Sequence, residues 1–482
     1  MKQSGKKQDL LFILFMGIFL TGFSLIFLTS TSPLSTCFYG NDSAFFRFIG
    51  SEMLRGKELY TEIWDHKGPI LYFIQEIGAL HGTRNEKISL IFVIELLMIY
   101  LSAFFMYKIC AATSKSHHKK ILFFLLTVCS LTILGCIWEG GNFSEDWSIP
   151  MICCSLYMFA AYALHSGQDP RHPRRYAFLH GICFALIAFI RINNAISICA
   201  GAAVIGIYLL SRKLWKNFME NLLFGLLGIA AVTLPLFVRF GLSHTLHEML
   251  YATFFFNLKY SEDASIPLTF QSLVFRFLPI ASSLLAELLF LLKNRKIRLI
   301  DILSLAIIFA NILLFLKINR YDHYFIVYLP VFLFTLILYT DRQNVFSLLV
   351  PALVFAYYIN HTVNLGRYYL RSGQQPNYAT ANLYFPKAEK DSAIAINVNP
   401  EVYLNTGIRP CSRFVANQRR HFAVNPAFEE EFIKTLQEKK PLWIIGNCSP
   451  DGSVPYAEYL PELRYELRFN DSTYCFFRQT EP

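Results

Sequence analysis

The feature that most constrains this chain is a succession of apolar runs, each long enough to cross a lipid bilayer. A transmembrane helix needs about 20 predominantly apolar residues. About eleven such runs follow one another, at residues 10–29, 88–110, 121–138, 147–165, 176–190, 195–210, 220–239, 272–292, 299–317, 324–340 and 345–361. The sequence therefore predicts an α-helical polytopic membrane protein with about 11 transmembrane helices.

The composition agrees with a membrane chain. Of the 482 residues, 54% are hydrophobic and 16% are charged, and the mean hydropathy is +0.38, which exceeds what a soluble globular chain usually carries. The net charge of +10 would be compatible with binding to nucleic acid. However, the basic residues gather between the apolar runs, where orientation in the bilayer explains them better. We expect the lipid bilayer as a partner and no nucleic acid.

The basic clusters predict the orientation. They are Lys2, Lys6 and Lys7; Lys115, Lys119 and Lys120; Arg171, Arg174 and Arg175; Arg212, Lys213 and Lys216; and Lys293, Arg295, Lys296 and Arg298. All fall on one side if every run crosses once, so the positive-inside rule places the N-terminus in the cytoplasm of a multi-pass cell-membrane protein. The first run is longer than a usual signal-peptide core, which favours a membrane anchor over a cleaved signal. An odd number of spans puts the C-terminal segment outside.

The chain divides into two predicted domains. A transmembrane domain occupies residues 1–368, and its first outer loop is residues 30–85. Residues 369–482 read as short strands, turns and a helix near 426–439, which predicts a small extracytoplasmic α/β domain. This domain contains Cys411, Cys448 and Cys475; one pair could be oxidised, and the sequence does not say which. Residues 240–270 predict an amphipathic helix, or a segment that covers the site or holds the acceptor.

The first outer loop concentrates charge beside the bilayer. After Asn41, Asp42 and Ser43, apolar residues recur at helical spacing until Gly56, which predicts a helix along the membrane surface. Asp42 therefore has two interpretations: an ordinary N-cap, or a carboxylate that takes part in chemistry.

Asp65, His66 and Lys67 precede a Gly-Pro turn and a further apolar helix. An acid and an ammonium at headgroup depth suit a reaction on a lipid-linked phosphate: the acid takes a proton from an acceptor hydroxyl, and the ammonium neutralises the leaving phosphate. The alternative for Lys67 is that it snorkels to the bilayer surface.

The pattern from Asp42 to Tyr72, Asp-Ser-x-x-Phe … Leu-x-Gly-x-x-x-Tyr-x-x-x-x-Asp-x-Lys-Gly-Pro-x-x-Tyr, resembles the first outer loop of the GT-C superfamily of integral-membrane glycosyltransferases. More narrowly, it resembles the bacterial family 39-like branch related to dolichyl-phosphate-mannose protein mannosyltransferases and aminoarabinose transferases. The resemblance implies a GT-C-like catalytic domain at 1–368 and a polyprenyl-phosphate-linked sugar as donor. It implies a cell-envelope glycan, lipid or protein as acceptor in a bacterial plasma membrane. It places Asp42 where the family has its catalytic aspartate and Lys67 where a lysine contacts the carrier phosphate.

The chain departs from the family pattern at two places. The relatives often have Asp-Glu where this chain has Asp42 and Ser43, and Glu-Lys-Pro where it has His66, Lys67, Gly68 and Pro69. The missing acid leaves open whether a divalent metal ion takes part.

Further candidate residues lie in the outer loops. We predict that Arg191 and Arg320 bind the donor phosphate together with Lys67. Supporting candidates are Tyr60, Asp65, His66, Tyr72, Glu145, Asp146, His323 and Tyr324. Arg191 could instead be an interfacial anchor, Glu145 and Asp146 could stabilise a helix N-terminus, and the tyrosines could belong to an aromatic belt.

The predicted function is a glycosyltransferase that moves a hexosyl or pentosyl group by inverting displacement, with Asp42 as general base. Two alternatives come from other classes. A transporter or flippase for lipid-linked sugars should show paired halves and charges near mid-membrane. A non-catalytic partner of a glycan assembly complex should show no turnover.

Overall fold

The computed structural model describes the chain except for residues 1, 36–39, 81–88, 114–118, 261–269, 295, 318–320, 341–344, 372–388, 390–391, 450–452, 471–473 and 481–482. The described chain forms two compact units. We call residues 1–28, 92–239 and 263–371 the helical unit, and residues 29–91, 240–262 and 372–482 the mixed unit. The predicted division at residues 368 and 369 stays a prediction.

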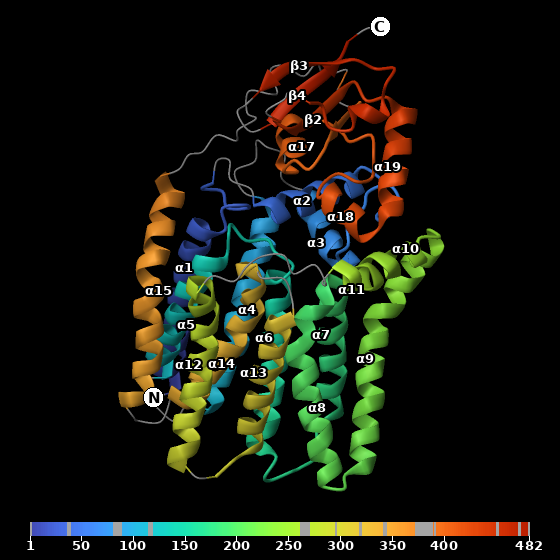
Figure 1. Cartoon of the computed structure of the whole chain (residues 1–482). Coiled ribbons are helices and arrows are strands. Elements are labelled where there is room, and N and C mark those ends of the chain that lie inside the picture. The colour runs from blue at the N-terminus through green and yellow to red at the C-terminus, as the bar shows by residue number, and fades with distance from the viewer. Residues whose placement is uncertain are drawn as a thin grey trace. The chain divides into compact units, whose positions relative to one another are not determined.

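Long helices make up the helical unit (Figure 1). They are α1 (Lys2–Phe27), α4 (Leu90–Thr113), α5 (Lys119–Ile137), α6 (Ile149–His165), α7 (Arg174–Arg191), α8 (Ile196–Ser211), α9 (Trp215–Leu242), α12 (Phe270–Asn294), α13 (Leu299–Lys317), α14 (Leu329–Thr340) and α15 (Val345–Arg371). Within the described ranges, 10 helical stretches are long and apolar enough to span a membrane. One of them, Arg174–Ser211, contains both α7 and α8, because the extended backbone of Arg191 (φ −162°, ψ 110°) ends α7. The predicted polytopic helical fold is confirmed.

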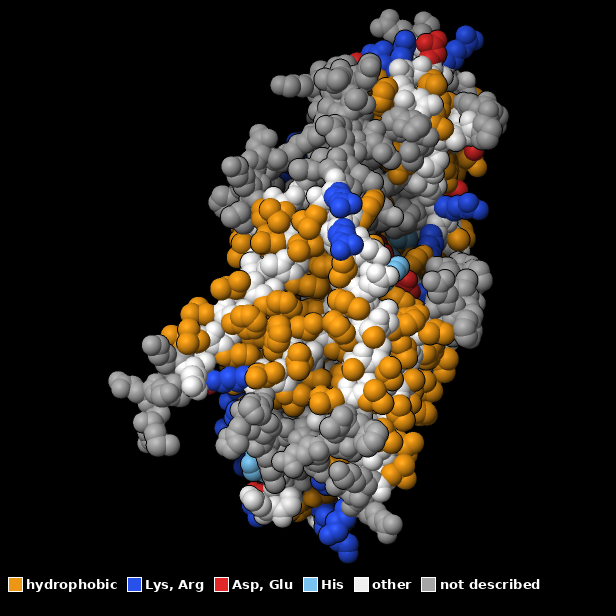
Figure 2. Space-filling model, turned by 90° about the vertical axis from the view of Figure 1, so that its left-hand side faces the viewer, with side chains coloured by type: hydrophobic (Ala, Val, Ile, Leu, Met, Phe, Trp, Pro, Cys, Tyr) orange, Lys and Arg blue, Asp and Glu red, His pale blue; other side chains and the backbone are white. Residues whose placement is uncertain are grey.

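The helical unit carries apolar side chains on its outside as well as in its core. Figure 2 shows hydrophobic side chains covering its flank, and Leu222, Leu226, Leu234 and Val238 of α9 are each about half exposed or more. All twelve residues of α14, in contrast, are buried. An apolar exterior around a buried central helix suits a protein that is solvated by lipid. The chain is therefore a multi-pass membrane protein.

The mixed unit contains α2 (Asn41–Leu54) and α3 (Pro69–Ala79), which pack closely. Its sheet has the order β1 (Ala393–Ala395), β2 (Trp443–Asn447), β4 (Tyr474–Gln479) and β3 (Tyr465–Asn470). β1 is parallel to β2, and the other two pairs are antiparallel. The helices α17 (Glu401–Thr406), α18 (Gln418–Val424) and α19 (Pro426–Lys439) accompany the sheet. The predicted C-terminal α/β region is confirmed, and its predicted helix near 426–439 is α19.

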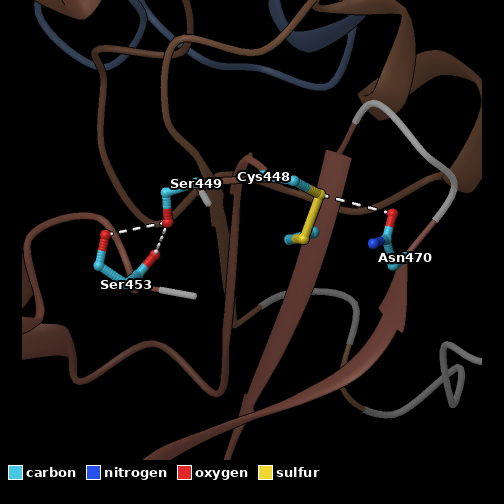
Figure 3. Close-up of a disulfide and its surroundings, with 5 residues drawn as sticks. Cys448, Ser449, Ser453 and Asn470 are labelled. Carbon is cyan, nitrogen blue, oxygen red and sulfur yellow. Dashed lines mark hydrogen bonds between the residues drawn. A yellow bond between two sulfur atoms is a disulfide. The ribbon is translucent and has the colours of Figure 1, made fainter. Parts of the chain in front are cut away.

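A disulfide joins Cys448, which follows β2, to Cys475 in β4 (Figure 3). The two Cα atoms lie 5.0 Å apart, because Gly446 pairs with Cys475 in the β2–β4 register. Cys411 remains a free thiol, and its burial raises its pKa to about 11. The structure thus selects one of the pairings that the sequence left open.

Candidate functional site

The turn between α2 and α3 is folded around Tyr60. Tyr60 has φ of 75°, a conformation that is uncommon for a residue with a side chain, and it is fully buried. Its amide donates to Ile63 O at 2.7 Å, and its hydroxyl donates to Lys67 O at 2.8 Å. Backbone strain of this kind persists only where surrounding contacts hold it, and it gathers at functional sites.

Three consecutive polar residues in this turn are buried: Asp65, His66 and Lys67 are 1%, 4% and 9% exposed. The Nδ1 atom of His66 lies 2.9 Å from Asp65 Oδ1, and its Nε2 atom lies 2.8 Å from Lys67 Nζ. An ammonium group has donors only, so Nε2 accepts from Lys67, and the ring proton is on Nδ1, facing Asp65. The imidazole therefore lies between the carboxylate and the ammonium, and its contact with Asp65 is electrostatic, without hydrogen-bond geometry.

Electrostatics keep Asp65 ionised. Burial acts to raise its pKa, but the neighbouring His66, Lys67 and His421 together hold the pKa well below its usual range. The hydroxyl of Tyr72, on α3, also donates to Asp65 Oδ2.

Asp42 lies in the first turn of α2, close enough to Tyr72 to affect it. Burial raises the pKa of Tyr72, and the negative charges of Asp65 and Asp42 raise it further. The N-cap of α2 is Gly40, with no side-chain cap bond, so Asp42 does not fill the cap position that its sequence context suggested. Within the described part of the chain, no hydrogen bond or ion pair engages its partly exposed carboxylate. The Asp42 carboxylate is therefore partly open to the surroundings of the described chain.

The C-terminal segment holds the turn in place. Arg413 donates from Nη1 to Tyr60 O at 2.7 Å, and its carbonyl accepts from Trp64 N at 3.0 Å. The guanidinium also donates two hydrogen bonds, of 2.6 and 2.7 Å, to the Glu431 carboxylate. The Trp64 ring lies 4.8 Å from the Phe428 ring and 4.9 Å from the His421 ring, centre to centre. A fork-shaped arginine contact of this kind fixes position as well as charge.

A third segment of the mixed unit contacts the same turn. Residues 246–260 form α10 (Leu246–Leu250), a π-helical turn (Tyr251–Phe255) and α11 (Phe256–Tyr260). Asn257 donates to His66 O at 2.6 Å, and the Tyr260 and His66 rings lie 4.3 Å apart. π-helical turns are rare and frequently occur at functional sites.

Asp65, His66 and His421 could hold a metal ion, since their ligand atoms lie within 4.8 Å of one another. Two imidazoles and a carboxylate would leave one tetrahedral position of a zinc ion open. Both nitrogens of buried His421 lack a hydrogen-bond partner among the described residues, and burial lowers the pKa of His421 to about 3. An ion bound to His66 Nδ1 would displace the proton that this nitrogen carries while Nε2 accepts from Lys67, so the ion would disturb the Lys67 contact.

The helical unit contains a second group of predicted residues. Arg191, where α7 ends, forms an ion pair with buried Glu145, and its guanidinium lies 3.9 Å from the centre of the Tyr324 ring. Burial acts to raise the pKa of Glu145, but the Arg191 charge and the neighbouring His323 lower it overall. Glu145 thus offsets much of the Arg191 charge.

The loop before α6 has an unusual backbone. Four consecutive residues, 139–142, have positive φ. Asp146 closes the loop by accepting from Trp138 Nε1 at 2.8 Å and from Phe143 N at 2.9 Å. The His323 ring stacks on Phe143, with 4.2 Å between ring centres.

The structure thus gathers the predicted site residues into two groups. Asp42, Tyr60, Asp65, His66, Lys67 and Tyr72 lie in the mixed unit, and Glu145, Asp146, Arg191, His323 and Tyr324 lie in the helical unit. Arg320 lies outside the described residues. Sequence reasoning missed Arg413, Asn257 and His421, which contact the turn from far along the chain. A signal for Arg413 and His421 would have been polar residues beside aromatic ones in the C-terminal segment.

Comparisons with known proteins agree with this architecture. Residues 3–347 match the family described as the putative competence-induced protein Ccs4 N-terminal domain. No curated protein matches the chain.

Among solved structures, ArnT from Cupriavidus metallidurans bound to undecaprenyl phosphate has a TM-score of 0.64 and 11% identity to this chain, covering 95% of this chain and 97% of that one. The same protein in the apo state has a TM-score of 0.61 and 12% identity, covering 98% of each chain. The likeness shows that the chain has a GT-C-like membrane fold, as the first-loop motif predicted.

Proposed function

This chain belongs to the Ccs4 N-terminal domain family, and we propose that it is a glycosyltransferase that moves a sugar from a polyprenyl-phosphate carrier to a cell-envelope acceptor. One observation carries the proposal. In a GT-C-like fold, the first loop presents Asp42, whose carboxylate has no partner among the described residues, and a buried ammonium, Lys67, that contacts His66 beside Asp65. A base and a fixed positive charge are what transfer from a lipid phosphate requires.

The proposed reaction is a single displacement at the anomeric carbon. Asp42 accepts the proton of the acceptor hydroxyl, whose oxygen forms a bond to the anomeric carbon. The bond from that carbon to the phosphate oxygen of the carrier breaks, and polyprenyl phosphate leaves with the electron pair. Lys67 stabilises the charge that develops on the phosphate, and attack opposite the leaving group inverts the configuration.

Asp65 and His66 serve as positioning residues in this proposal. The Asp65 carboxylate favours the Nδ1–H form of His66, and this form directs a lone pair at Lys67 Nζ. The ammonium is thus pre-oriented, so little reorganisation is needed when the phosphate leaves. Tyr72 donates a hydrogen bond to the Asp65 carboxylate, and Asn257 donates one to the His66 carbonyl. These two bonds hold Asp65 and His66 in place.

The donor class has two supports. A solved structure with the same fold, ArnT, is bound to undecaprenyl phosphate, and the apolar flank of the helical unit would contact the prenyl chain of such a carrier. We propose that Arg191 and Tyr324 assist at the donor, with Glu145 holding the guanidinium in place, and that Arg320 adds a further positive charge. This scheme does not use a divalent metal at Asp65, His66 and His421, because such an ion would draw Asp65 and His66 away from the arrangement that orients Lys67.

The proposed orientation has the N-terminus in the cytoplasm and the C-terminal region outside. The alternating basic clusters support this. The Cys448–Cys475 disulfide also supports it, because disulfides persist mainly in oxidising compartments.

The test is transfer from a panel of short-chain polyprenyl-phosphate sugars by the purified full chain. We expect turnover of at least one donor, and a loss of roughly 100-fold or more in Asp42→Asn and Lys67→Ala. Asp169→Asn is the matched control, because its exposed carboxylate accepts from Arg171 N and from no other group in the described part of the chain. Full activity in Asp42→Asn would overturn the assignment of the base.

A further inference from the structure

A cavity of about 310 Å³ lies in the helical unit, among α6, α7, α8 and α9. Its walls are mostly apolar and include Phe184, Ile198 and Leu226, whereas three polar side chains, His172, His180 and Asn221, also line it. None of these residues belongs to the candidate site described above.

The polar side chains lie at one end of the cavity. His172 directly precedes α7, Asn221 is in the second turn of α9, and Leu209, which also lines the cavity, is near the end of α8. Ile198 and Ile229 lie about two to three turns further along α8 and α9. The cavity thus has a polar end at the starts of α7 and α9 and the end of α8, and an apolar end that reaches Ile229 in the middle of α9 and Ile198 in the first turn of α8. This is the distribution of polarity in a membrane lipid.

The hydrogen bonds of His172 fix its protonation. The amide nitrogen of Asn221 donates to two carbonyls, His172 O at 3.2 Å and Asn217 O at 2.7 Å. Its oxygen therefore faces His172 Nδ1, 2.6 Å away, and Nδ1 must carry the proton. Burial lowers the pKa of His172 to about 4, so the ring is neutral at pH 7. The Nε2 atom of His172 therefore carries no proton and can only accept a hydrogen bond. It is buried and has no partner among the described residues.

His180 adds a donor and a second acceptor. Its ring stacks on Phe159 with centres 4.2 Å apart and lies 6.0 Å from the His172 ring. His180 is buried, at 7% exposed. Even so, neither of its ring nitrogens has a hydrogen-bond partner in the described part of the chain. A buried polar group without a partner is costly, so three such nitrogens together indicate a missing ligand.

We propose that this cavity is a binding site for a membrane lipid whose head group carries a free hydroxyl. The hydroxyl donates to His172 Nε2 and accepts from the N–H of His180, and the lipid chain fills the apolar end. A hydroxyl fits because the bare lone pair requires a donor and the second imidazole offers one of its own. A phosphate oxygen would place negative charge against the His172 lone pair.

Water alone would satisfy the histidines but not the apolar end. Leu222 and Leu226 line the cavity and are each about half exposed, so the cavity opens on the apolar flank of the helical unit. An amphiphile satisfies both ends. This site is independent of the proposed transfer reaction, and its occupancy does not depend on a sugar donor.

The test uses the purified full chain and two photoreactive probes, a long-chain alcohol and its methyl ether. The two share the same chain, but only the alcohol can donate to His172. We expect the alcohol to label α7, α8 and α9 roughly tenfold more strongly than the ether, since only the alcohol forms the hydrogen bond to His172 Nε2. The hydroxyl-bearing lipid itself should co-purify with the wild-type chain, and mass spectrometry of extracted lipids would identify it as a neutral glyceride or a phosphoglyceride.

Two variants, each with a matched control, test separately how the polar end and the apolar end of the cavity contribute to binding of the probes. His180→Phe should weaken labelling by the alcohol and by the ether alike, because the oxygen of either probe accepts from the His180 N–H. The variant should fold normally, because it removes unpartnered polar atoms from a ring stack; exposed His165→Phe should leave the labelling by both probes unchanged. Ala202→Trp should block labelling by filling the cavity, whereas Ala203→Trp, at the adjacent exposed alanine outside the lining, should not. Equal labelling by alcohol and ether, or undiminished labelling of Ala202→Trp, would overturn the proposal.

Discussion

The ammonium of Lys67 lies 2.8 Å from Nε2 of His66, and both side chains are more than nine-tenths buried. A neutral imidazole can hold an ammonium in this way only if its other nitrogen carries the proton. Asp65 favours that form, so the position of the positive charge depends on a residue that would not touch the substrate. Several measurable consequences follow from this arrangement and from the contacts around it.

Asp65→Asn should impair sugar transfer by roughly 10- to 100-fold, the range seen when a group that orients a ligand is removed. The neutral amide no longer favours the Nδ1–H form of His66, so Lys67 is less firmly placed. The loss should fall mainly on kcat, as the donor can still bind. Steady-state kinetics measure how the loss divides between kcat and KM. A rise in KM with unchanged kcat would contradict the positioning role.

Arg413→Ala should destabilise the turn at residues 57–68. The buried Tyr60 carbonyl would lose its arginine partner, at a cost of about 1–3 kcal/mol. We expect a lower unfolding temperature and faster proteolysis within the turn. Arg419→Ala, which removes an exposed arginine side chain, should leave both unchanged; similar effects in the two variants would show that Arg413 has no special role.

Acidification should destabilise the chain through His421. The pKa of His421 is about 3 in the folded state, against its ordinary value of 6.5. Between these values the unfolded chain binds more protons, so stability falls as pH falls. At pH 5 the loss from His421 is about 2 kcal/mol relative to pH 7.5. Thermal unfolding at both pH values, in wild type and His421→Phe, measures it. The variant should lose less stability on acidification; an identical loss would assign the effect to other groups, such as His172.

Gly50→Ala should force α2 and α3 apart. A Cβ atom at residue 50 would lie 2.5 Å from the backbone carbon of Gln75, which is rigid. Overpacking of this kind costs about 1–3 kcal/mol. Gly56 has open space around it but a φ of +96°, so Gly56→Ala should destabilise only through local backbone strain. Denaturant titration of both variants distinguishes a steric from a conformational cost.

Chelation should leave transfer intact, and excess Zn²⁺ should inhibit it. Lys67 already supplies a positive charge, whereas zinc would draw Asp65 and His66 away from the arrangement that orients it. His421→Phe should relieve the inhibition because it removes one of three ligands. Loss of transfer in EDTA, restored by a divalent cation, would show instead that the metal belongs to the mechanism.

The sequence predicted the parts of the fold that local patterns encode. Runs of about 20 apolar residues predict α1 or α13 without knowledge of their neighbours, and the Gly-Pro break correctly predicts the start of α3 at Pro69. The disulfide could not be chosen, because three cysteines allow three pairings until the β2–β4 register is known.

The candidate site was predictable in its residues more than in its connections. Asp65, His66 and Lys67 are adjacent in the chain, so their proximity needed no structure. The direction of each His66 nitrogen did need one, as did the placement of the α2 cap at Gly40 instead of Asp42. The contacts of Arg413 and His421 with the turn could not be predicted from the sequence, because no local periodicity links residues so far apart along the chain.

The hydrogen bond from Arg413 to the Tyr60 carbonyl joins residues 353 positions apart. A ribosome adds about 5–20 residues per second, so Tyr60 is made roughly 20 to 70 s before its partner. During that interval the helices can enter the bilayer one after another, while the strained turn lacks the arginine that holds it. The turn is thus completed by a segment that is made long after it, and a chain stalled before Arg413 would be inserted in the membrane without an assembled turn.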